Sequence, residues 1–125
     1  MLHSEITDKI LKAFYQVYNT LGYGFLEKVY ENAMVIELRK SGFEILQQKN
    51  IKVYYDGQVV GDYYADLMVN NAVIVELKAS AAICEEHEAQ LLNYLRATDI
   101  EVGMLLNFGK KAEFKRKILT NDRKR

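Results

Sequence analysis

The first forty residues carry apolar side chains at the spacing of amphipathic helices. Between residues 4 and 20 these side chains recur every three to four positions, which places them on one face of a helix. Ser4 suits the N-cap, and Gly22 ends the pattern. A second segment of this kind runs from Leu26 to Lys40 and is followed by Gly42. The pattern therefore predicts two consecutive helices. In the second helix, the positions expected to face the core are Leu26, Val29, Tyr30, Ala33, Ile36 and Leu38.

The hydrophobic period changes at Ile51 from helical spacing to two-residue alternation, which indicates strands. The first strand ends at Asp56-Gly57, a strong signal for a hairpin turn. A second strand follows from about Val59 to Val69, with Gly61 suited to a bulge. After another turn, Val73 to Lys78 forms a third strand. The pattern thus predicts three consecutive strands joined by short turns.

The remaining segments return to helix and then to strand. Glu85 to Ala97 has helical spacing, and Val102 to Asn107 has the composition of a buried strand. Beyond them, alternation around Phe114 and Arg116 fits either an edge strand or a short helix. The chain has no proline, repeat or linker-like stretch, so we expect a single domain over residues 1–125. The element order α-α-β-β-β-α-β, with an optional last strand, predicts a mixed α/β fold.

The composition excludes several classes of protein. Half of the residues are apolar and 27% are charged, which is ordinary for a soluble globular protein. No apolar run approaches the roughly 20 residues that cross a bilayer. The N-terminal segment contains acidic residues and no small-residue cleavage site, unlike a secretory signal. The single Cys84 excludes an internal disulfide and a cysteine set for zinc. We therefore expect a cytoplasmic protein without a membrane segment.

The charges are distributed unevenly along the chain. The 17 Lys and Arg balance the 17 Asp and Glu, which argues against a generally basic protein that coats nucleic acid. However, residues 1–109 carry a net charge of −6 and residues 110–125 one of +6. This basic tail either contacts phosphates or forms a solubilising terminus that frays from about residue 120. Arg116 is the favoured phosphate contact because it lies inside a patterned segment. The other basic residues of the tail are Lys110, Lys111, Lys115, Lys117, Arg123, Lys124 and Arg125.

Two acidic residues lie within the predicted strands. Asp66 interrupts an apolar strand, and ten residues later Glu76-Leu77-Lys78 ends the next one. Glu76 and Lys78 share a face, because side chains two positions apart in a strand point the same way. A three-residue turn from Asn70 to Ala72 would place Asp66 directly opposite Glu76, whereas a two-residue turn would turn Asp66 to the other face. Since Asn tolerates the left-handed conformation, we predict the three-residue turn.

Two carboxylates in this register repel each other and need a cation. Oxygen ligands without a nearby His or Cys suit Mg²⁺ or Mn²⁺. Lys78, on the same face, can position a water or stabilise a developing negative charge. These groups are the parts needed for metal-assisted hydrolysis of a phosphodiester. The alternative is that Asp66, Glu76 and Lys78 are exposed positions on a sheet face, joined by a minor salt bridge.

The predicted third helix carries further polar side chains on one face. His87, Gln90 and Tyr94 fall at positions i, i+3 and i+7. A glutamine there can hold a water or the scissile phosphate, and a tyrosine hydroxyl can donate to a phosphate oxygen. His87 suits an orienting or surface role better than that of a metal ligand. The alternative is a solvated helix face with a half-buried tyrosine.

Taken in order, the motifs of the chain resemble those of a known family. Residues 24–30 read G-x-x-E-x-x-Y, and they are followed by the strand with Asp66, the E-L-K of residues 76–78 and the H-E-A-Q-L-L-N-Y-L of residues 87–95. This set resembles the GxxExxY protein family of the PD-(D/E)XK nuclease-like superfamily, from about Ile6 to Ile118. The resemblance implies a restriction-endonuclease-like core, with a mixed sheet of four or slightly more strands flanked by helices.

The resemblance also implies a set of metal ligands. Asp66 and Glu76 would be the metal-binding acids, with the backbone carbonyl of Leu77 as a further ligand. Glu27 would be the acidic residue that the first core helix directs towards the site. Ala65 stands where the superfamily's literal P-D pair has proline, a departure that leaves the ligating aspartate in place.

Catalytic roles follow from the same resemblance. Lys78 would be the catalytic lysine of the superfamily. Gln90 and Tyr94 match the Q-x-x-x-Y helix of its exonuclease-type branches. The first hypothesis is therefore a Mg²⁺- or Mn²⁺-dependent nuclease acting on DNA or RNA. The second is a non-catalytic module on the same fold that binds nucleic acid or a partner protein, which the small size of the chain favours. Hydrolysis of a small phosphorylated molecule is a third option.

Tyrosines cluster in the predicted first hairpin. They fall on both faces of its strands, where they can stack on bases or pack in a core or an interface. A long hairpin with exposed aromatic residues on a small chain also predicts a homodimer. These residues are Tyr54, Tyr55, Tyr63 and Tyr64.

Overall fold

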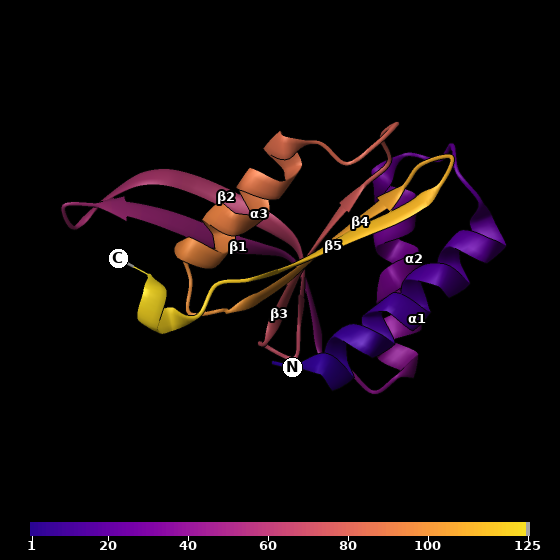
Figure 1. Cartoon of the computed structure of the whole chain (residues 1–125), viewed down its shortest axis with the longest axis horizontal. Coiled ribbons are helices and arrows are strands. Elements are labelled where there is room, and N and C mark those ends of the chain that lie inside the picture. The colour runs from indigo at the N-terminus through magenta and orange to yellow at the C-terminus, as the bar shows by residue number, and fades with distance from the viewer. Residues whose placement is uncertain (125) are drawn as a thin grey trace.

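The structure is a computed structural model that describes residues 1–124 (Figure 1). Three helices lie along the chain: α1 (Ser4–Leu21), α2 (Glu27–Lys40) and α3 (Glu85–Arg96). Five strands form the sheet: β1 (Ile45–Tyr55), β2 (Gln58–Val69), β3 (Val73–Lys78), β4 (Val102–Phe108) and β5 (Ala112–Ile118). A short 3₁₀ helix, η1 (Asn121–Arg123), follows the last strand.

The strands lie in one sheet in the order β1-β2-β3-β4-β5. Every neighbouring pair is antiparallel except β3 and β4, which are parallel and joined by the crossover helix α3. The mixed α/β fold and the element order predicted from the sequence are confirmed, and the arrangement is consistent with a restriction-endonuclease-like fold. The ambiguous segment after β4 is the edge strand β5 and not a short helix.

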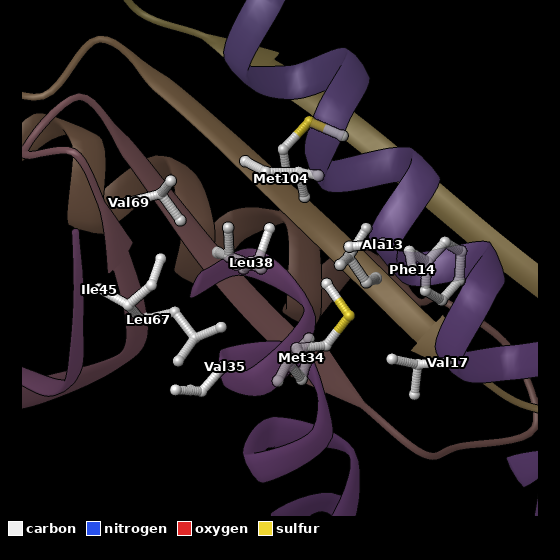
Figure 2. Close-up of a cluster of buried hydrophobic side chains, with 14 of the residues drawn as sticks. Ala13, Phe14, Val17, Met34, Val35, Leu38, Ile45, Leu67, Val69 and Met104 are labelled. Atoms are coloured by element: carbon white, nitrogen blue, oxygen red, sulfur yellow. The ribbon is translucent and has the colours of Figure 1, made fainter. Parts of the chain in front are cut away.

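Helices cover both faces of the sheet. One hydrophobic cluster joins α1 and α2 to the sheet, and Figure 2 shows side chains of both helices meeting Ile45, Leu67 and Met104 of the strands. A second, smaller cluster lies beneath α3 on the other face. Residues such as Val75 and Leu77 therefore face α1 and α2, whereas Ile74 faces α3. None of the helices within residues 1–124 is long and apolar enough to cross a membrane.

The buried face of α2 differs from the prediction. Leu26 is 81% exposed, Ile36 is 59% exposed and Val29 is 39% exposed, so this part of the predicted core face is wrong. The loop before α2 sets the phase of the helix, because the hydroxyl of Tyr30 donates to the carbonyl of Gly22 at 2.7 Å and turns that ring inwards. The side chains that are buried instead are Tyr30, Glu31, Met34, Val35 and Leu38.

Strand β1 begins six residues earlier than predicted, at Ile45 and not at Ile51. It is an edge strand that pairs only with β2, so most of its side chains between these two isoleucines remain exposed and polar. A polar edge strand protects the sheet from pairing with other chains. The same polarity removes the hydrophobic alternation by which a strand is recognised, which explains the late predicted start.

The hairpin of β1 and β2 extends as a two-stranded arm beyond the rest of the sheet (Figure 1). Strand β2 pairs with β3 only over residues 67–69, whereas it pairs with β1 along its whole length. The turn at Asp56 and Gly57 has positive φ at both residues, and the pairing shifts between Val53 and Tyr54, opposite Gly61 and Val59. The predicted hairpin turn and the irregularity near Gly61 are therefore present.

Residues 121–124 contact the rest of the fold, where the sequence left open a phosphate-binding tail or a solubilising, frayed one. The backbone N–H of Asn121 donates to Glu101 at 2.7 Å, and the Lys124 ammonium donates to the carbonyls of Thr98 and Ile100 at 2.8 and 2.7 Å. These contacts hold η1 against the loop between α3 and β4. Arg125, the last basic residue of the predicted tail, lies outside the described residues.

Candidate functional site

The candidate site lies where β2 and β3 separate. The turn between them gives the pairs Val69–Val73 and Leu67–Val75, which is the three-residue turn predicted from Asn70 to Ala72. Asn70 and Asn71 both adopt the left-handed conformation on which that prediction rested. In this register Asp66 comes opposite Glu76, one position beyond the last ladder pair. The sequence therefore predicted correctly that these two acids face each other.

Where the β2–β3 ladder ends, side-chain hydrogen bonds of Asp66 and Glu76 take the place of backbone pairing. The N–H of Asp66 donates to Glu76 Oε2 at 2.7 Å, and the N–H of Leu77 donates to Asp66 Oδ2 at 2.8 Å. Each side chain thus binds the backbone of the opposite strand, which fixes both carboxyl groups and satisfies the amides freed by the separation of the strands. We call this arrangement the carboxylate fork.

Burial raises the pKa values of both carboxyl groups in the carboxylate fork. Glu76 is 4% exposed, and its pKa is raised to about 8 by burial, then by the negative charge of Asp66, with a smaller contribution from Glu27. The pKa of Asp66 is raised as well, chiefly by burial and then by the charge of Glu31, against a lowering effect of the Leu77 N–H. Two adjacent acids that hold protons this tightly form a site that a cation would stabilise.

Lys78 lies two residues beyond Glu76 on β3, on the sheet face that α3 covers. Its charge lowers the pKa of both carboxyl groups. Within residues 1–124, however, no ion pair within 4 Å joins Lys78 to Asp66 or Glu76. With Glu76 buried and no such ion pair, the alternative of an exposed sheet face with a minor salt bridge does not fit this structure.

The loop after Lys78 is fixed by β4. Asn107, which pairs with Lys78 and is completely buried, accepts from the N–H of Ser80 and donates to the carbonyl of Ser80, both at 3.0 Å. Gly109 packs so closely on this loop that a Cβ atom would lie 2.6 Å from the Ser80 carbonyl. The end of β3 is therefore held in place immediately beyond the lysine. The sequence analysis missed Asn107, although a lone amide in an apolar strand was its visible signal.

Helix α3 brings Gln90 and Tyr94 to the carboxylate fork. The Gln90 amide donates to the Tyr94 hydroxyl at 2.6 Å, and the pKa of Tyr94 is raised by burial and by the charge of Glu76. His87 lies apart from this pair, because its Nδ1 accepts from the N–H of Cys84 and caps the start of α3. Gln90 and Tyr94 also line a groove of about 1090 Å³ between α3 and the arm.

Helix α2 contributes two acidic residues, of which the sequence analysis identified one. Glu27, in its first turn, is close enough to raise the pKa of Glu76. Glu31, one turn further, is 4% exposed and accepts hydrogen bonds from Lys28 at 3.0 Å and from the amides of Gln47 and Gln48 at 2.8 and 3.0 Å. The signal for Glu31 was its place in the stripe with Met34 and Leu38, which the wrong helix phase concealed.

The basic residues predicted to contact phosphates divide between the two faces of the sheet. Lys115 pairs with Leu105, which pairs with Glu76, so Lys115 lies in the same row across the sheet as the carboxylate fork. Arg116 is the next residue along β5, on the opposite face, where its guanidinium donates to the carbonyl of Leu2. Lys110 and Lys111 are exposed in the β4–β5 turn, at the end of the sheet where Lys78 lies.

A divalent cation fits the chemistry of the carboxylate fork. The available donors are carboxylate oxygens and the carbonyl of Leu77, the hard ligands that Mg²⁺ and Mn²⁺ prefer. Glu76 is buried with the half-buried Asp66 beside it, and Glu76 Oε1 accepts no hydrogen bond among residues 1–124. In that same part of the chain, no three His, Cys, Asp or Glu side chains converge closely enough to enclose a metal. The fork thus supplies two carboxylate ligands and leaves further positions for a carbonyl, water or substrate.

Comparison with known families matches residues 4–117 to the PD-(D/E)XK nuclease superfamily. The chain belongs to this superfamily. Nucleases of the PD-(D/E)XK superfamily generally use divalent metals. In this chain, the literal P-D pair of the superfamily is replaced by Ala65-Asp66.

A solved structure has a similar fold. The crystal structure of SSO0001 matches at a TM-score of 0.59 and 18% identity, over 77% of this chain and 52% of that one. At this level of identity the match shows the fold alone. The chain spans about half the length of that structure. The comparison with curated proteins gave no match.

Proposed function

We propose that the chain is a Mg²⁺- or Mn²⁺-dependent nuclease that hydrolyses phosphodiester bonds in DNA or RNA. The observation that carries this proposal is the carboxylate fork: a buried and a half-buried acid that face each other, both with raised pKa values, and a lysine on the neighbouring position of the same sheet face. Membership of the PD-(D/E)XK nuclease superfamily supports the same class of reaction.

Four groups are proposed to hold the cation. Asp66 and Glu76 supply carboxylate oxygens, the backbone carbonyl of Leu77 supplies a third oxygen, and Glu27 lies at the edge of the site. A divalent cation in this place supplies Lewis acidity and neutralises charge on the scissile phosphate. Glu76 would hold the cation as the ionised carboxylate, because a nearby positive charge favours that form.

The neighbouring side chains are proposed to act on the water and the phosphate. Lys78 orients the attacking water or donates to the oxygen on which negative charge develops, a role that suits a lysine with no ion pair to residues 1–124. Tyr94 donates its hydroxyl proton to a phosphate oxygen. Gln90, which holds the Tyr94 hydroxyl at 2.6 Å, sets the direction of that donation. Burial beneath α3 strengthens each of these contacts by excluding water.

Three lysines near the carboxylate fork or at the same end of the sheet are proposed to bind the phosphate backbone away from the cut. Lys115 lies in the row of Glu76, and Lys110 and Lys111 are exposed beyond the end of β3. Arg116, the residue that the sequence favoured, has its guanidinium on the carbonyl of Leu2 and faces away from this row. We therefore assign the backbone contacts to the three lysines in preference to Arg116.

The proposal is tested by cleavage of labelled single-stranded and duplex DNA and RNA with Mn²⁺. We expect the wild-type chain to cut at least one of them, and Lys78→Ala and Glu76→Gln to lower the rate about a hundredfold or more. A matched control is Lys40→Ala, which removes an exposed lysine at the far end of α2. Equal cutting by the wild type and Lys78→Ala would mean a contaminating nuclease and would end the proposal.

One observation favours the alternative of a non-catalytic module that binds nucleic acid or a partner protein. Among the described residues, no set of three potential side-chain ligands encloses a metal. Calorimetry separates the two functions, because a nuclease site binds Mn²⁺ or Mg²⁺ and loses that binding in Asp66→Asn. Nucleic-acid binding that is unchanged by either ion or by EDTA, with no heat of metal binding, would favour the module.

A homodimer through the arm stays a prediction. Tyr54, Tyr55, Val59 and Val60 are exposed on its two strands, which is a surface that a second copy can cover. Sedimentation velocity across a range of concentrations tests this prediction. A Val60→Asp variant should shift a dimer to the monomer, and a wild-type chain that sediments as a monomer throughout would contradict it.

A further inference from the structure

Gln48 has a backbone conformation that its surroundings do not explain. It lies in the middle of β1 with φ +52°, in the left-handed region that residues with a side chain avoid. The other non-glycine residues with positive φ in the described chain lie before α1 or in turns, where this conformation is ordinary. Strain of this kind persists where the structure gains something from it, and it gathers at functional sites.

The conformation of Gln48 coincides with a reversal of the strand faces. Leu67 packs beneath α1 and α2, whereas Ala65, two residues earlier, packs beneath α3. On β1, Ile45 and Ile51 differ in the same way, although an even separation normally keeps side chains on one face. In both strands, therefore, the side chains exchange faces of the sheet near Gln48 and Asp66. These two residues are opposite each other, and they form the one pair between residues 45 and 53 of β1 that is absent from the β1–β2 ladder.

This reversal brings Gln48 onto the carboxylate fork. Gln47 and Gln48 are consecutive, yet both amides reach Glu31, which a regular strand would not allow. The Gln48 amide nitrogen also donates to Asp66 Oδ1 at 3.3 Å. One NH₂ group thus bridges a buried carboxylate of α2 and the aspartate of the fork. Without it, these two acids would face each other with no donor between them.

We propose that Gln48 is a positioning residue that fixes the Asp66 carboxylate, and that the left-handed backbone at this residue serves that contact. Asp66 Oδ2 accepts from the N–H of Leu77, and Oδ1 accepts from the Gln48 amide. With a donor on each oxygen, the orientation of the carboxylate plane is fixed. Glu31 is held in place by hydrogen bonds from Lys28 and Gln47, and it in turn accepts from the Gln48 amide and so limits the movement of that side chain. The inference rests on the proposed metal-dependent function, because a fixed Asp66 matters for binding a cation.

The test uses Gln48→Gly, which removes the amide while glycine keeps the left-handed backbone without strain. The matched control is Gln58→Ala, which removes an exposed amide at the far end of the arm, opposite Tyr55. Three quantities are measured in the full chain: the midpoint of thermal unfolding, the exchange rate of the Leu77 amide relative to that of Leu105 by NMR, and the dissociation constant for Mn²⁺ by calorimetry.

In Gln48→Gly the relief of backbone strain offsets part of the loss of the two hydrogen bonds, so we expect the variant to fold, while its Leu77 amide exchanges faster as Asp66 loosens. Its affinity for Mn²⁺ should fall about tenfold, as for other residues that orient metal ligands. Gln58→Ala should leave both the relative exchange rate and the Mn²⁺ affinity at the wild-type value. Unchanged Leu77 exchange in Gln48→Gly would overturn the inference. A wild-type chain that binds no Mn²⁺ would instead overturn the proposed function, while the exchange rate would still decide the role of Gln48.

Discussion

At the scale of single residues, the chemistry of this molecule is concentrated in Glu76. A carboxyl group buried beside another acid costs free energy when it ionises, and the cost is seen in its pKa of about 8. Because the folded state holds the proton more tightly than the unfolded chain, the folded protein is favoured at low pH. This contribution is lost as the pH rises through the folded-state pKa.

Glu76 therefore makes the stability of the cation-free protein depend on pH. In EDTA, the free energy of unfolding should fall between about pH 5 and pH 8 with a slope of up to about 1.4 kcal/mol per pH unit from this group. Glu76→Gln, which keeps the shape and removes the titration, should flatten the profile and be the more stable variant at pH 8. Urea unfolding at several pH values measures this difference. Identical profiles for the two proteins would show that Glu76 is ionised in the folded state at neutral pH.

Tyr94 provides a second test at this scale. Tyr94→Phe removes one hydroxyl that accepts from Gln90 at 2.6 Å and leaves the ring in the cluster beneath α3. We expect a cleavage rate reduced about tenfold to a hundredfold, with the affinity for Mn²⁺ unchanged, because the hydroxyl is assigned to the phosphate and not to the cation. A loss of Mn²⁺ binding in this variant would contradict that assignment.

At the scale of elements, the position of α3 against β4 decides whether Gln90 and Tyr94 reach the fork. Gly103 makes this close approach possible, because a Cβ atom there would lie 2.6 Å from Leu91 Cδ1. Gly103→Ala should destabilise the protein by about 1–3 kcal/mol through overpacking. Combining it with Leu91→Ala should recover part of that loss, since the clashing methyl group is gone. Additive losses in chemical unfolding would place the cause elsewhere.

The elements also show what a sequence can predict. Val73–Lys78 and the turn before it were predicted with the correct register, because two asparagines and a strongly apolar strand define them locally. The phase of α2 was predicted wrongly, because Leu26 and Ile36 are as apolar as the side chains that are buried. Tertiary contacts, such as those of Tyr30 with Gly22 and Phe108, accompany the face that is buried, and they are not visible in the sequence.

The same reasoning applies to the candidate site. Asp66, Glu76 and Lys78 were recognisable because acids and a lysine stand out in apolar strands. Gln48 was not recognisable, since a glutamine in a polar edge strand carries no signal of left-handed backbone. Glu31 was concealed by the error in helix phase. Supporting residues of this kind depend on tertiary contacts, and periodicity alone does not reveal them.

At the scale of the whole molecule, the acidic and basic residues are unevenly distributed around the candidate site. Lys115 of β5 lies in the same row across the sheet as Glu76, and Lys110 and Lys111 are exposed at the end of the sheet where Lys78 lies, so a neutral chain still has basic residues near an acidic site. Binding of nucleic acid should therefore weaken as salt increases, in proportion to the number of phosphates contacted.

A pair of neighbouring residues tests this arrangement. Lys115→Ala should weaken binding of a catalytically inert complex, prepared in Ca²⁺ or EDTA, and reduce the slope of log affinity against log salt by about 1. Arg116→Ala should leave that slope unchanged, because its guanidinium faces the other way and donates to Leu2. Fluorescence anisotropy with labelled oligonucleotides gives both slopes. A slope reduced in Arg116→Ala and unchanged in Lys115→Ala would show that Arg116, and not Lys115, contacts a phosphate.

The central claim is that the carboxylate fork binds a divalent cation. The most direct measurement is the anomalous difference density of a crystal soaked in Mn²⁺ above pH 8, where Glu76 loses its proton most readily. We predict a peak between the carboxylates of Asp66 and Glu76, next to the carbonyl of Leu77, and its absence from crystals of Glu76→Gln treated in the same way. A wild-type crystal with no peak at the fork, or with manganese bound only elsewhere, would contradict the account.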